Sequence, residues 1–175
     1  MQRRHFLRQC GTLVVAWLLR PAWARSEQAE ATAQSGTITK LDKPLSAWRA
    51  LLPSQAYAVL FEEATERPFS SPLNNEKRKG TFLCAACYLP LFESGAKFDS
   101  GTGWPSFYQP IDGHVGKKTD YKLIVRRTEY HCIRCGGHQG HVFDDGPPPT
   151  GERWCNNGLA LQFVPTDEPL PALRT

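Results

Sequence analysis

Hydrophobic and polar positions follow a helical period in the first part of this chain. In residues 43–69, KPLSAWRALLPSQAYAVLFEEATERPF, apolar side chains recur three or four positions apart, which is the spacing of one face of an α-helix. We predict two short helices, the first capped by Ser46 and the second with Pro53 at its first position. The stripe of the second helix that faces the core consists of Tyr57, Leu60, Phe61 and Ala64.

The pattern changes to short apolar or alternating runs from Thr81 onward. Runs such as TFLC, LPLF, YKLIVRR, HVF and LALQFVP are separated by turn-forming clusters such as SGTGWPS and DDGPPPTG. This texture predicts a mainly β fold of antiparallel sheets with short N-terminal helices. We interpret residues 151–165, GERWCNNGLALQFVP, as one strand in which alternate residues share a face. That face comprises Arg153, Cys155, Asn157, Leu159, Leu161 and Phe163.

The opening of the chain has the layout of an export signal. Residues 1–24 contain Arg3 and Arg4, an apolar run and a small-x-small site at Ala22-Trp23-Ala24, and the apolar run is too short for a stable membrane span. The paired arginines are similar to a twin-arginine signal, which predicts a periplasmic protein; an ordinary secretory signal or an uncleaved tether is the alternative. Residues 25–40 read as a flexible polar linker, which leaves residues 41–168 as the folded domain.

Removing the signal changes the charge balance. Four of the 21 Lys and Arg residues lie in residues 1–24, which contain no Asp or Glu, so the remainder has 17 cations against 17 acids. A chain with no net charge and no basic cluster gives no support for nucleic-acid binding. The sixth cysteine, Cys10, also lies in the signal, so five cysteines remain.

Four of these five cysteines form two Cys-x-x-Cys units. The units are FLCAACYLPLF, with Cys84 and Cys87, and YHCIRCGGH, with Cys132 and Cys135. Two such units supply four thiolates for a closed tetrahedral zinc site, one structural zinc per chain. Residues 88–131 lie between them, so the fold must bring two hairpins together for the metal to clip them.

Other interpretations of the paired cysteines are two disulfides, thioredoxin-like redox pairs, or simple packing. A redox Cys-x-x-Cys normally begins a helix in a βαβ unit, and neither unit has that context. Twin-arginine export would allow folding and metal loading before exposure to oxidant, which favours zinc.

The fifth cysteine, Cys155, has polar company. Arg153 stands two residues before it, and a nearby cation favours the nucleophilic thiolate by lowering the thiol's pKa. GGHQGHVFDDG contributes His138 and His141, and SGTGWPSF contributes Trp104. A lone buried cysteine is usually a small hydrophobic residue, but this combination of residue types indicates a reactive site. The histidines are alternative zinc ligands, although four cysteines already complete a tetrahedral site.

These motifs together resemble the B-type peptide methionine sulfoxide reductases, which reduce methionine-R-sulfoxide. The resemblance is carried by ATERPFSSPLNN, CAACYLPLF, KFDSGTGWPSF, GHQGHVFDDGPPPTG and RWCNNGLAL, in that order over roughly residues 41–165. It implies a β-rich, β-tent-like fold and a methionine-R-sulfoxide substrate in proteins or peptides; together with the export signal, it predicts repair of oxidised exported proteins. A thioredoxin-like or other thiol reductant and a monomeric enzyme are also expected.

The resemblance implies a role for each site residue. Cys155 attacks the sulfoxide sulfur and becomes a sulfenic acid, while His138 and His141 lie near the sulfoxide oxygen, where a proton is delivered. The remaining matches are residues of the thiolate pocket (Asn157, Arg153), a nearby acid (Asp145), the aromatic that packs the substrate methyl group (Trp104), and zinc ligands (Cys84, Cys87, Cys132, Cys135).

The chain departs from the family pattern at several positions. Thr102 stands where many members carry a resolving cysteine, so an external thiol is expected to reduce the sulfenic acid. The other departures are Trp154, Asn156-Asn157-Gly158, Gln139 and Lys122-Leu123-Ile124-Val125, which concern substrate preference more than reaction type. A zinc-scaffolded binding module without turnover and a disulfide oxidoreductase using the Cys-x-x-Cys units are the rival hypotheses.

Overall fold

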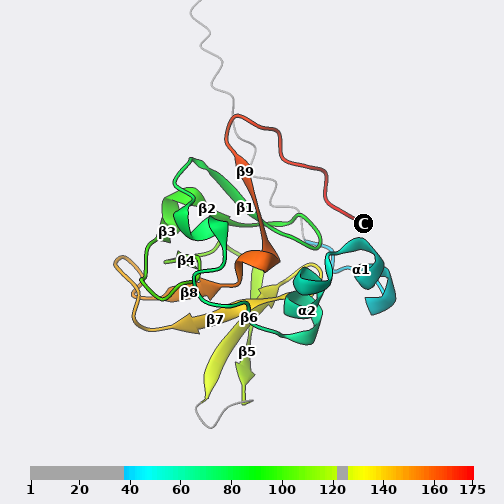
Figure 1. Cartoon of the computed structure of the whole chain (residues 1–175), viewed down its shortest axis with the longest axis horizontal. Coiled ribbons are helices and arrows are strands. Elements are labelled where there is room, and N and C mark those ends of the chain that lie inside the picture. The colour runs from blue at the N-terminus through cyan, green and yellow to red at the C-terminus, as the bar shows by residue number, and fades with distance from the viewer. Residues whose placement is uncertain (1–37, 122–125) are drawn as a thin grey trace, which may run out of the picture. The chain divides into compact units, whose positions relative to one another are not determined.

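The structure is a computed structural model that describes residues 38–121 and 126–175 (Figure 1). The predicted export signal, residues 25–37 of the linker and the departure at residues 122–125 lie outside the described residues. Residues 38–40, the end of the expected linker, have no regular secondary structure.

The described fold begins with two short α-helices, as predicted, but neither helix begins at the residue predicted from the sequence. α1 spans Leu45–Leu51 and α2 spans Ser54–Glu62, and each is preceded by a proline in an extended conformation. The Pro53 carbonyl accepts the first hydrogen bond of α2 from Tyr57 at 2.9 Å. The prediction that Pro53 is the first helical residue is therefore wrong by one position. Ser46 is also not a cap, because it lies inside the first turn of α1.

The stripe predicted for α2 does face the core. Tyr57 and Leu60 are buried, and Phe61 stacks on Trp48 of α1 with ring centroids 5.5 Å apart. Ala64 packs against the core from beyond the helix, because Glu63 adopts a left-handed conformation that ends α2. Neither of these helices is long and apolar enough to cross a membrane.

The strands form two antiparallel sheets, which confirms the predicted fold class. The smaller sheet has the order β2-β1-β9, with β2 Pro90–Glu93, β1 Gly80–Cys84 and β9 Leu161–Pro165. The larger sheet has the order β3-β4-β8-β7-β6-β5. Its strands are β3 Lys97–Phe98, β4 Ser106–Phe107, β8 Arg153–Asn156, β7 His138–Phe143, β6 Arg127–Cys132 and β5 Val115–Asp120. The described residues also contain three short 3-10 helices: η1 Pro72–Asn75 between α2 and β1, η2 Ser94–Ala96 between β2 and β3, and η3 Gly158–Ala160 between β8 and β9.

Residues 151–165 are not one strand, contrary to the prediction. β8 belongs to the larger sheet and β9 to the smaller, and η3 separates them. The Glu66 carboxylate accepts hydrogen bonds from the backbone N–H groups of Gly158 at 2.5 Å and Leu159 at 3.0 Å. These amides therefore bond to a side chain from a distant part of the chain instead of a strand ladder, and the chain changes sheet at this point.

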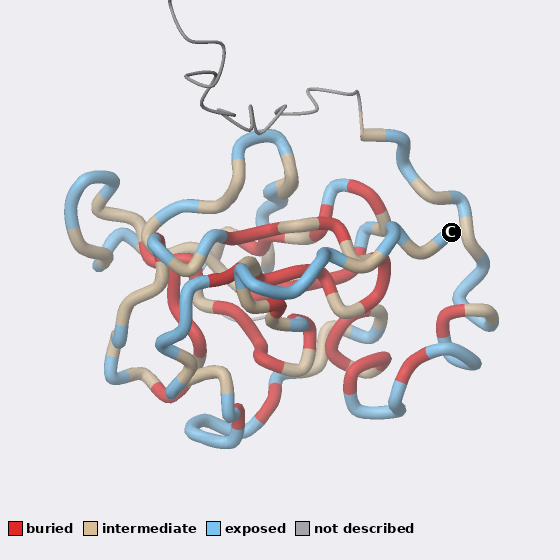
Figure 2. The backbone as a smooth tube through the Cα atoms, turned by 90° about the horizontal axis from the view of Figure 1, so that it is seen from above, coloured by how far each residue is buried: buried red, intermediate tan, exposed pale blue. Residues whose placement is uncertain are grey.

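Aromatic side chains from both sheets pack together in the core. Phe92 of β2 stacks on Phe107 of β4 with centroids 4.1 Å apart, and Phe82 of β1 meets the same ring edge-on at 4.9 Å. Tyr130 of β6 and Trp154 of β8 extend the cluster. Each such pair adds about 0.5–1.5 kcal/mol beyond area burial. Figure 2 shows the buried backbone concentrated in the middle of the fold, and Trp154 packs β8 against this core.

Candidate active site

Cys155 lies on a central strand of the larger sheet. β8 pairs with β4 on one side and β7 on the other, which places Cys155 opposite Ser106 and His141. Gly140 precedes His141 on β7, and a Cβ atom built there would lie 1.9 Å from the Cys155 carbonyl oxygen. A side chain at position 140 would push the two strands apart, so this glycine permits the close approach of the histidine strand and the cysteine strand.

A small pocket opens at Cys155. Its volume is about 120 Å³. The lining residues come from β6, from the paired strands β7 and β8, from the residue after β8, from the loop before β4 and from the segment after α2: Thr65, Trp104, Arg127, Gly140, His141, Phe143, Cys155, Asn156 and Asn157. Four residues predicted from the sequence, namely Cys155, His141, Trp104 and Asn157, therefore meet in one pocket. His138, Arg153 and Asp145 are not among the lining residues.

The charge environment of Cys155 differs from the expectation that its thiol ionises readily. Burial raises the pKa of the Cys155 thiol, and this effect outweighs the lowering caused by Arg153 and by a hydrogen bond with Thr102. The cation is already engaged, because Arg153 forms a two-bond ion pair with Asp145 at 2.8 and 2.9 Å. Asp145 itself raises the pKa of Cys155. The resting site therefore favours the neutral thiol.

His141 is held by a carboxylate at the edge of the pocket. Its Nε2 lies 2.8 Å from Oδ2 of Asp120, which also accepts a hydrogen bond from Arg127 at 2.6 Å. An ionised carboxylate only accepts hydrogen bonds, so Nε2 carries the hydrogen atom and Nδ1 is the remaining ring nitrogen. Burial lowers the pKa of His141 despite the opposing effect of Asp120. The neutral imidazole is therefore favoured, with Nδ1 as the ring nitrogen able to exchange a proton.

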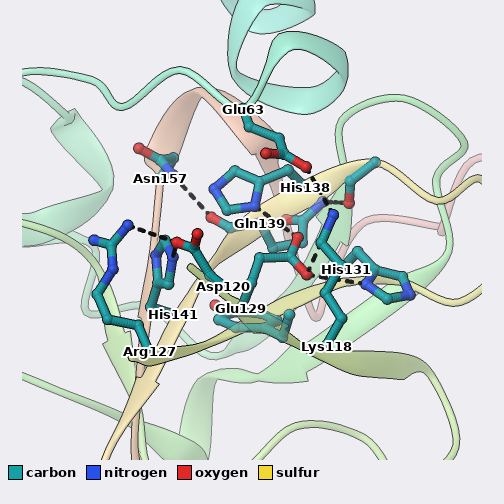
Figure 3. A network of polar contacts seen from close by, with 12 residues as sticks. Glu63, Lys118, Asp120, Arg127, Glu129, His131, His138, Gln139, His141 and Asn157 are labelled. Atoms are coloured by element: carbon teal, nitrogen blue, oxygen red, sulfur yellow. Dashed lines mark hydrogen bonds and ion pairs between the residues drawn. The ribbon is translucent and has the colours of Figure 1, made fainter. Parts of the chain in front are cut away.

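His138 belongs to a partly buried polar network beside His141 (Figure 3). Its Nδ1 lies 2.7 Å from Glu129 Oε1, and the other oxygen of Glu129 lies 3.2 Å from His131 Nδ1. Burial acts to raise the pKa of Glu129, but hydrogen bonds from His131 and His138 hold it at about 2. Lys118 adds a cation 4.0 Å from the same carboxylate. His138 and His141 rings are 5.5 Å apart, so this network supports the pocket beside His141.

Asn157 and Trp104 are fixed by the same residue, Glu66. The Asn157 amide accepts a hydrogen bond from the Glu66 backbone N–H at 3.0 Å and donates one to the Gln139 carbonyl at 3.0 Å. The Trp104 indole N–H donates to the Glu66 carbonyl at 3.1 Å. Both side chains therefore line the pocket with their polar groups already hydrogen-bonded to other residues.

The four paired cysteines converge on one point. Their sulfur atoms all lie within 4.8 Å of one another, and Cys84–Cys135 and Cys87–Cys132 are each 3.6 Å apart. A tetrahedral zinc with Zn–S bonds of about 2.3 Å would separate its sulfurs by about 3.8 Å, so the donor set fits this ion. The shortest contacts join the two Cys-x-x-Cys units rather than the cysteines within a unit, which speaks against two separate redox pairs.

A buried polar chain links this cluster to the strand of Cys155. Gln139 donates from Nε2 to the Cys84 sulfur at 3.6 Å, and its Oε1 accepts from Asn156 Nδ2 at 3.4 Å. Asn156 Oδ1 accepts in turn from the Tyr130 hydroxyl at 2.6 Å. Gln139, Asn156 and Tyr130 are fully buried. Asn156, which follows Cys155, is therefore connected to Cys84 of the four-cysteine cluster through two hydrogen bonds.

The chain is similar over most of its length to known proteins. A SelR domain matches residues 52–165. The peptide methionine sulfoxide reductase MsrB of Pseudomonas putida (strain W619) is 51% identical over 131 residues, covering 74% of this chain and 98% of that protein. The chain belongs to the MsrB family. The MsrB of Bradyrhizobium diazoefficiens is 52% identical over 130 residues, covering 74% of this chain and 94% of its own length, and that of Agrobacterium fabrum is 48% identical, covering 74% and 96%.

Membership of the MsrB family confirms the resemblance seen in the sequence. The protein is an oxidoreductase, a peptide-methionine (R)-S-oxide reductase. The predicted β fold with clustered cysteines is confirmed as well. A disulfide oxidoreductase that uses the Cys-x-x-Cys units has no support from the family or from the arrangement of the four sulfurs.

Several residues of this site were missed in the sequence analysis. Asp120, Arg127 and Glu129 come from β5 and β6, and Glu66 comes from the segment after α2. Glu66 lies in the ATERPF motif, so the motif was the available signal. Of the other three, only Arg127 lies in an apolar or alternating run named from the sequence, YKLIVRR, and only the pairing of β5, β6 and β7 places all three beside the histidines.

Proposed function

We propose that Cys155 reduces methionine-R-sulfoxide by direct attack on the sulfur. The thiolate forms a bond to the sulfoxide sulfur, the sulfoxide oxygen takes up a proton, and the oxygen is transferred to the cysteine. Methionine leaves and Cys155 becomes a sulfenic acid, so the substrate gains two electrons and the cysteine loses two. The observation that carries this proposal is the single pocket shared by Cys155, His141 and Trp104.

Residues that line the pocket and residues next to it each have a part in this step. His141 lines the pocket and exchanges the proton through the ring nitrogen that Asp120 does not hold. His138 and Glu129 position the neighbouring ring and set the local charge. Arg153 favours the thiolate form of Cys155, and the carboxylate of Asp145 offsets the positive charge of Arg153. The Asn157 side chain is fixed by its hydrogen bonds and lines the pocket. The apolar faces of Trp104 and Phe143 provide an environment in which the S-methyl group of the substrate binds more favourably than a water molecule does.

Regeneration uses a thiol from outside the chain. Among the described residues Cys155 is the one cysteine outside the four-sulfur cluster, and Thr102 interacts with Cys155 from the position of a resolving cysteine. A thioredoxin-like protein or small thiol attacks the sulfenic acid and releases water, and a second thiol reduces the mixed disulfide. An intramolecular disulfide that includes Cys155 in the substrate-oxidised protein would contradict this step.

The four-cysteine cluster would hold one structural zinc. Cys84, Cys87, Cys132 and Cys135 fill all four tetrahedral positions, so the bound ion supplies stability and not an open coordination site. It would clip the end of β1 to the turn between β6 and β7. Because β6 and β7 carry Glu129 and both histidines, metal loading supports the geometry of the pocket.

The biological role we propose is repair of oxidised methionine in exported proteins, by a monomeric enzyme located in the periplasm. The support is the twin-arginine-like layout of residues 1–24. Fusion of residues 1–24 to a reporter, with Arg3 and Arg4 replaced by Lys in a control, tests the route. Loss of export in the control is expected, and unchanged export would contradict the twin-arginine route.

A stereospecific assay tests the proposed reaction. With dithiothreitol as reductant, the enzyme should reduce the R-sulfoxide and not the S-sulfoxide of N-acetyl-methionine amide, because each epimer requires its own enzyme. Cys155→Ser should abolish turnover while retaining bound zinc at one equivalent per chain. Turnover that survives this substitution would refute Cys155 as the nucleophile, and a wild-type protein without turnover would be a binding module.

A further inference from the structure

The segment between α2 and η1 forms a fixed rim beside the pocket of Cys155. Glu66 anchors it with four hydrogen bonds: two from the backbone of η3, one to Asn157 and one from the Trp104 indole. Further along, the Ser70 hydroxyl donates to the Arg67 carbonyl at 2.6 Å. This segment is therefore tied to Asn157 and η3, which directly follow β8, and to Trp104.

This rim displays an aromatic side chain to solvent. Phe69 is 73% exposed, although its backbone N–H donates to the Gly103 carbonyl at 2.7 Å. Its φ of 61° is in the left-handed region, which a non-glycine residue adopts only against steric resistance. Gly103 makes the close approach possible, because a Cβ built there would lie 2.9 Å from the Phe69 nitrogen. An isolated exposed hydrophobic residue is ordinary, but a strained turn that fixes one beside an active site is not.

Phe69 also lines a hollow that adjoins the pocket of Cys155. This cavity has a volume of about 230 Å³ and is bounded by Phe69, Asn74, Lys97, Phe98 and Trp104 among others. Trp104 is shared, since it lines both this cavity and the pocket of Cys155. A ligand seated against Trp104 at the cysteine can therefore continue over the indole towards Phe69.

The small volume of the pocket of Cys155 indicates which part of a substrate must lie outside it. Complete small-molecule sites usually have volumes of about 300–1,000 Å³, whereas the pocket of Cys155 has about 120 Å³. It holds one side chain and leaves the backbone and neighbouring residues of a peptide outside. Adjacent residues of an extended chain are about 3.3–3.6 Å apart along its axis, so residues next to the oxidised methionine lie just outside the pocket.

We propose that Phe69 and the adjoining cavity form a subsite for an apolar side chain flanking methionine sulfoxide in a polypeptide. This inference rests on the proposed function of the Cys155 pocket. The subsite favours oxidised methionines in apolar sequence surroundings, which are exposed when proteins are unfolded. Its occupant is a polypeptide substrate, and the free amino acid does not reach it.

Three R-sulfoxide substrates test the subsite with dithiothreitol as reductant. They are N-acetyl-methionine amide, a pentapeptide with Leu on both sides of the methionine, and the same peptide with Ser at these positions. For the wild type we expect kcat/KM to be about tenfold higher for the Leu peptide than for the Ser peptide. Phe69→Ala should remove this preference, and Phe69→Leu should retain most of it. Leu45→Ala, which truncates a similarly exposed apolar residue on α1, should leave the preference unchanged.

Each outcome separates the subsite from the reaction itself. Equal kcat/KM for the two peptides in the wild type, or a preference that survives Phe69→Ala, would overturn the subsite while turnover of the short substrate upholds the proposed reaction. An equal loss on all three substrates in Phe69→Ala would show that Phe69 supports the fold of the rim instead. No turnover of any substrate by the wild type would overturn the proposed reaction and the subsite together.

Discussion

The ion pair of Arg153 with Asp145 controls how much of the Arg153 charge reaches Cys155. Arg153 lowers the pKa of the thiol and Asp145 raises it, while burial gives the largest contribution and raises it. Asp145→Asn removes the acidic charge and keeps the shape of the side chain. We predict that this substitution lowers the pKa of Cys155 and speeds its alkylation at pH 7.5.

The expected size follows from the exposure of the pair. The Asp145 side chain is 63% exposed, and charges at such sites interact with energies of about 0.2–1 kcal/mol. Because the thiol is mostly neutral at pH 7.5, its thiolate fraction rises in proportion to its acid dissociation constant, by up to about fivefold. A thiolate of lower pKa is a weaker nucleophile, which takes back nearly half of the logarithmic gain. The alkylation rate should therefore rise by about two- to threefold at most.

The assay is the pseudo-first-order rate of iodoacetamide labelling at Cys155, read by mass spectrometry of its peptide. Asp144→Asn is the matched control, since it removes the same charge from the neighbouring residue instead of the partner of Arg153. Arg153→Met should change the rate in the opposite direction. The reasoning is refuted if Asp145→Asn labels no faster than Asp144→Asn, or if Arg153→Met labels faster than the wild type.

Three further substitutions test other parts of the site. Asp120→Asn should lower the pKa of His141 further and move the alkaline limb of the kcat/KM profile to lower pH; a profile that superimposes on the wild type would count against His141 as proton donor. Glu66→Gln replaces one carboxylate oxygen with an NH2 group, which then faces one of the two backbone N–H groups of η3. The free energy of unfolding, measured with urea, should fall by about 1–3 kcal/mol. An unchanged free energy of unfolding would show that these two hydrogen bonds do not stabilise the fold. Gln139→Leu removes the hydrogen bond to Cys84 and should speed transfer of zinc to a coloured chelator; an unchanged rate would show that this bond does not protect the metal.

The fold and the reactive centre were accessible from local patterns in the sequence. The period of Tyr57 and Leu60 predicted a core-facing helix, and short runs between turn residues predicted antiparallel sheets. Cys155, His141 and Trp104 stand in compact motifs, so residue chemistry alone singled them out. These features depend on neighbours within a few positions of the chain, which is why one sequence was sufficient.

The features that sequence analysis missed depend on contacts between distant segments. The strand through residues 151–165 is interrupted because Glu66, more than 90 positions away, binds the backbone of η3. Asp120 reaches His141 only through the pairing of β5, β6 and β7. The pKa of the Cys155 thiol depends on distant contacts in the same way. Arg153, which lowers this pKa, stands two positions away in the sequence, whereas the burial that raises it is produced by the fold.

Trapping the oxidised cysteine tests the central claim most directly. The reduced, zinc-loaded enzyme would be treated with one equivalent of methionine-R-sulfoxide peptide without reductant, and then with a sulfenic-acid probe. The account predicts one adduct at Cys155, one equivalent of methionine formed and four cysteines still bound to zinc. Methionine formed without modification of Cys155, or with oxidation of the four-cysteine cluster instead, would contradict it.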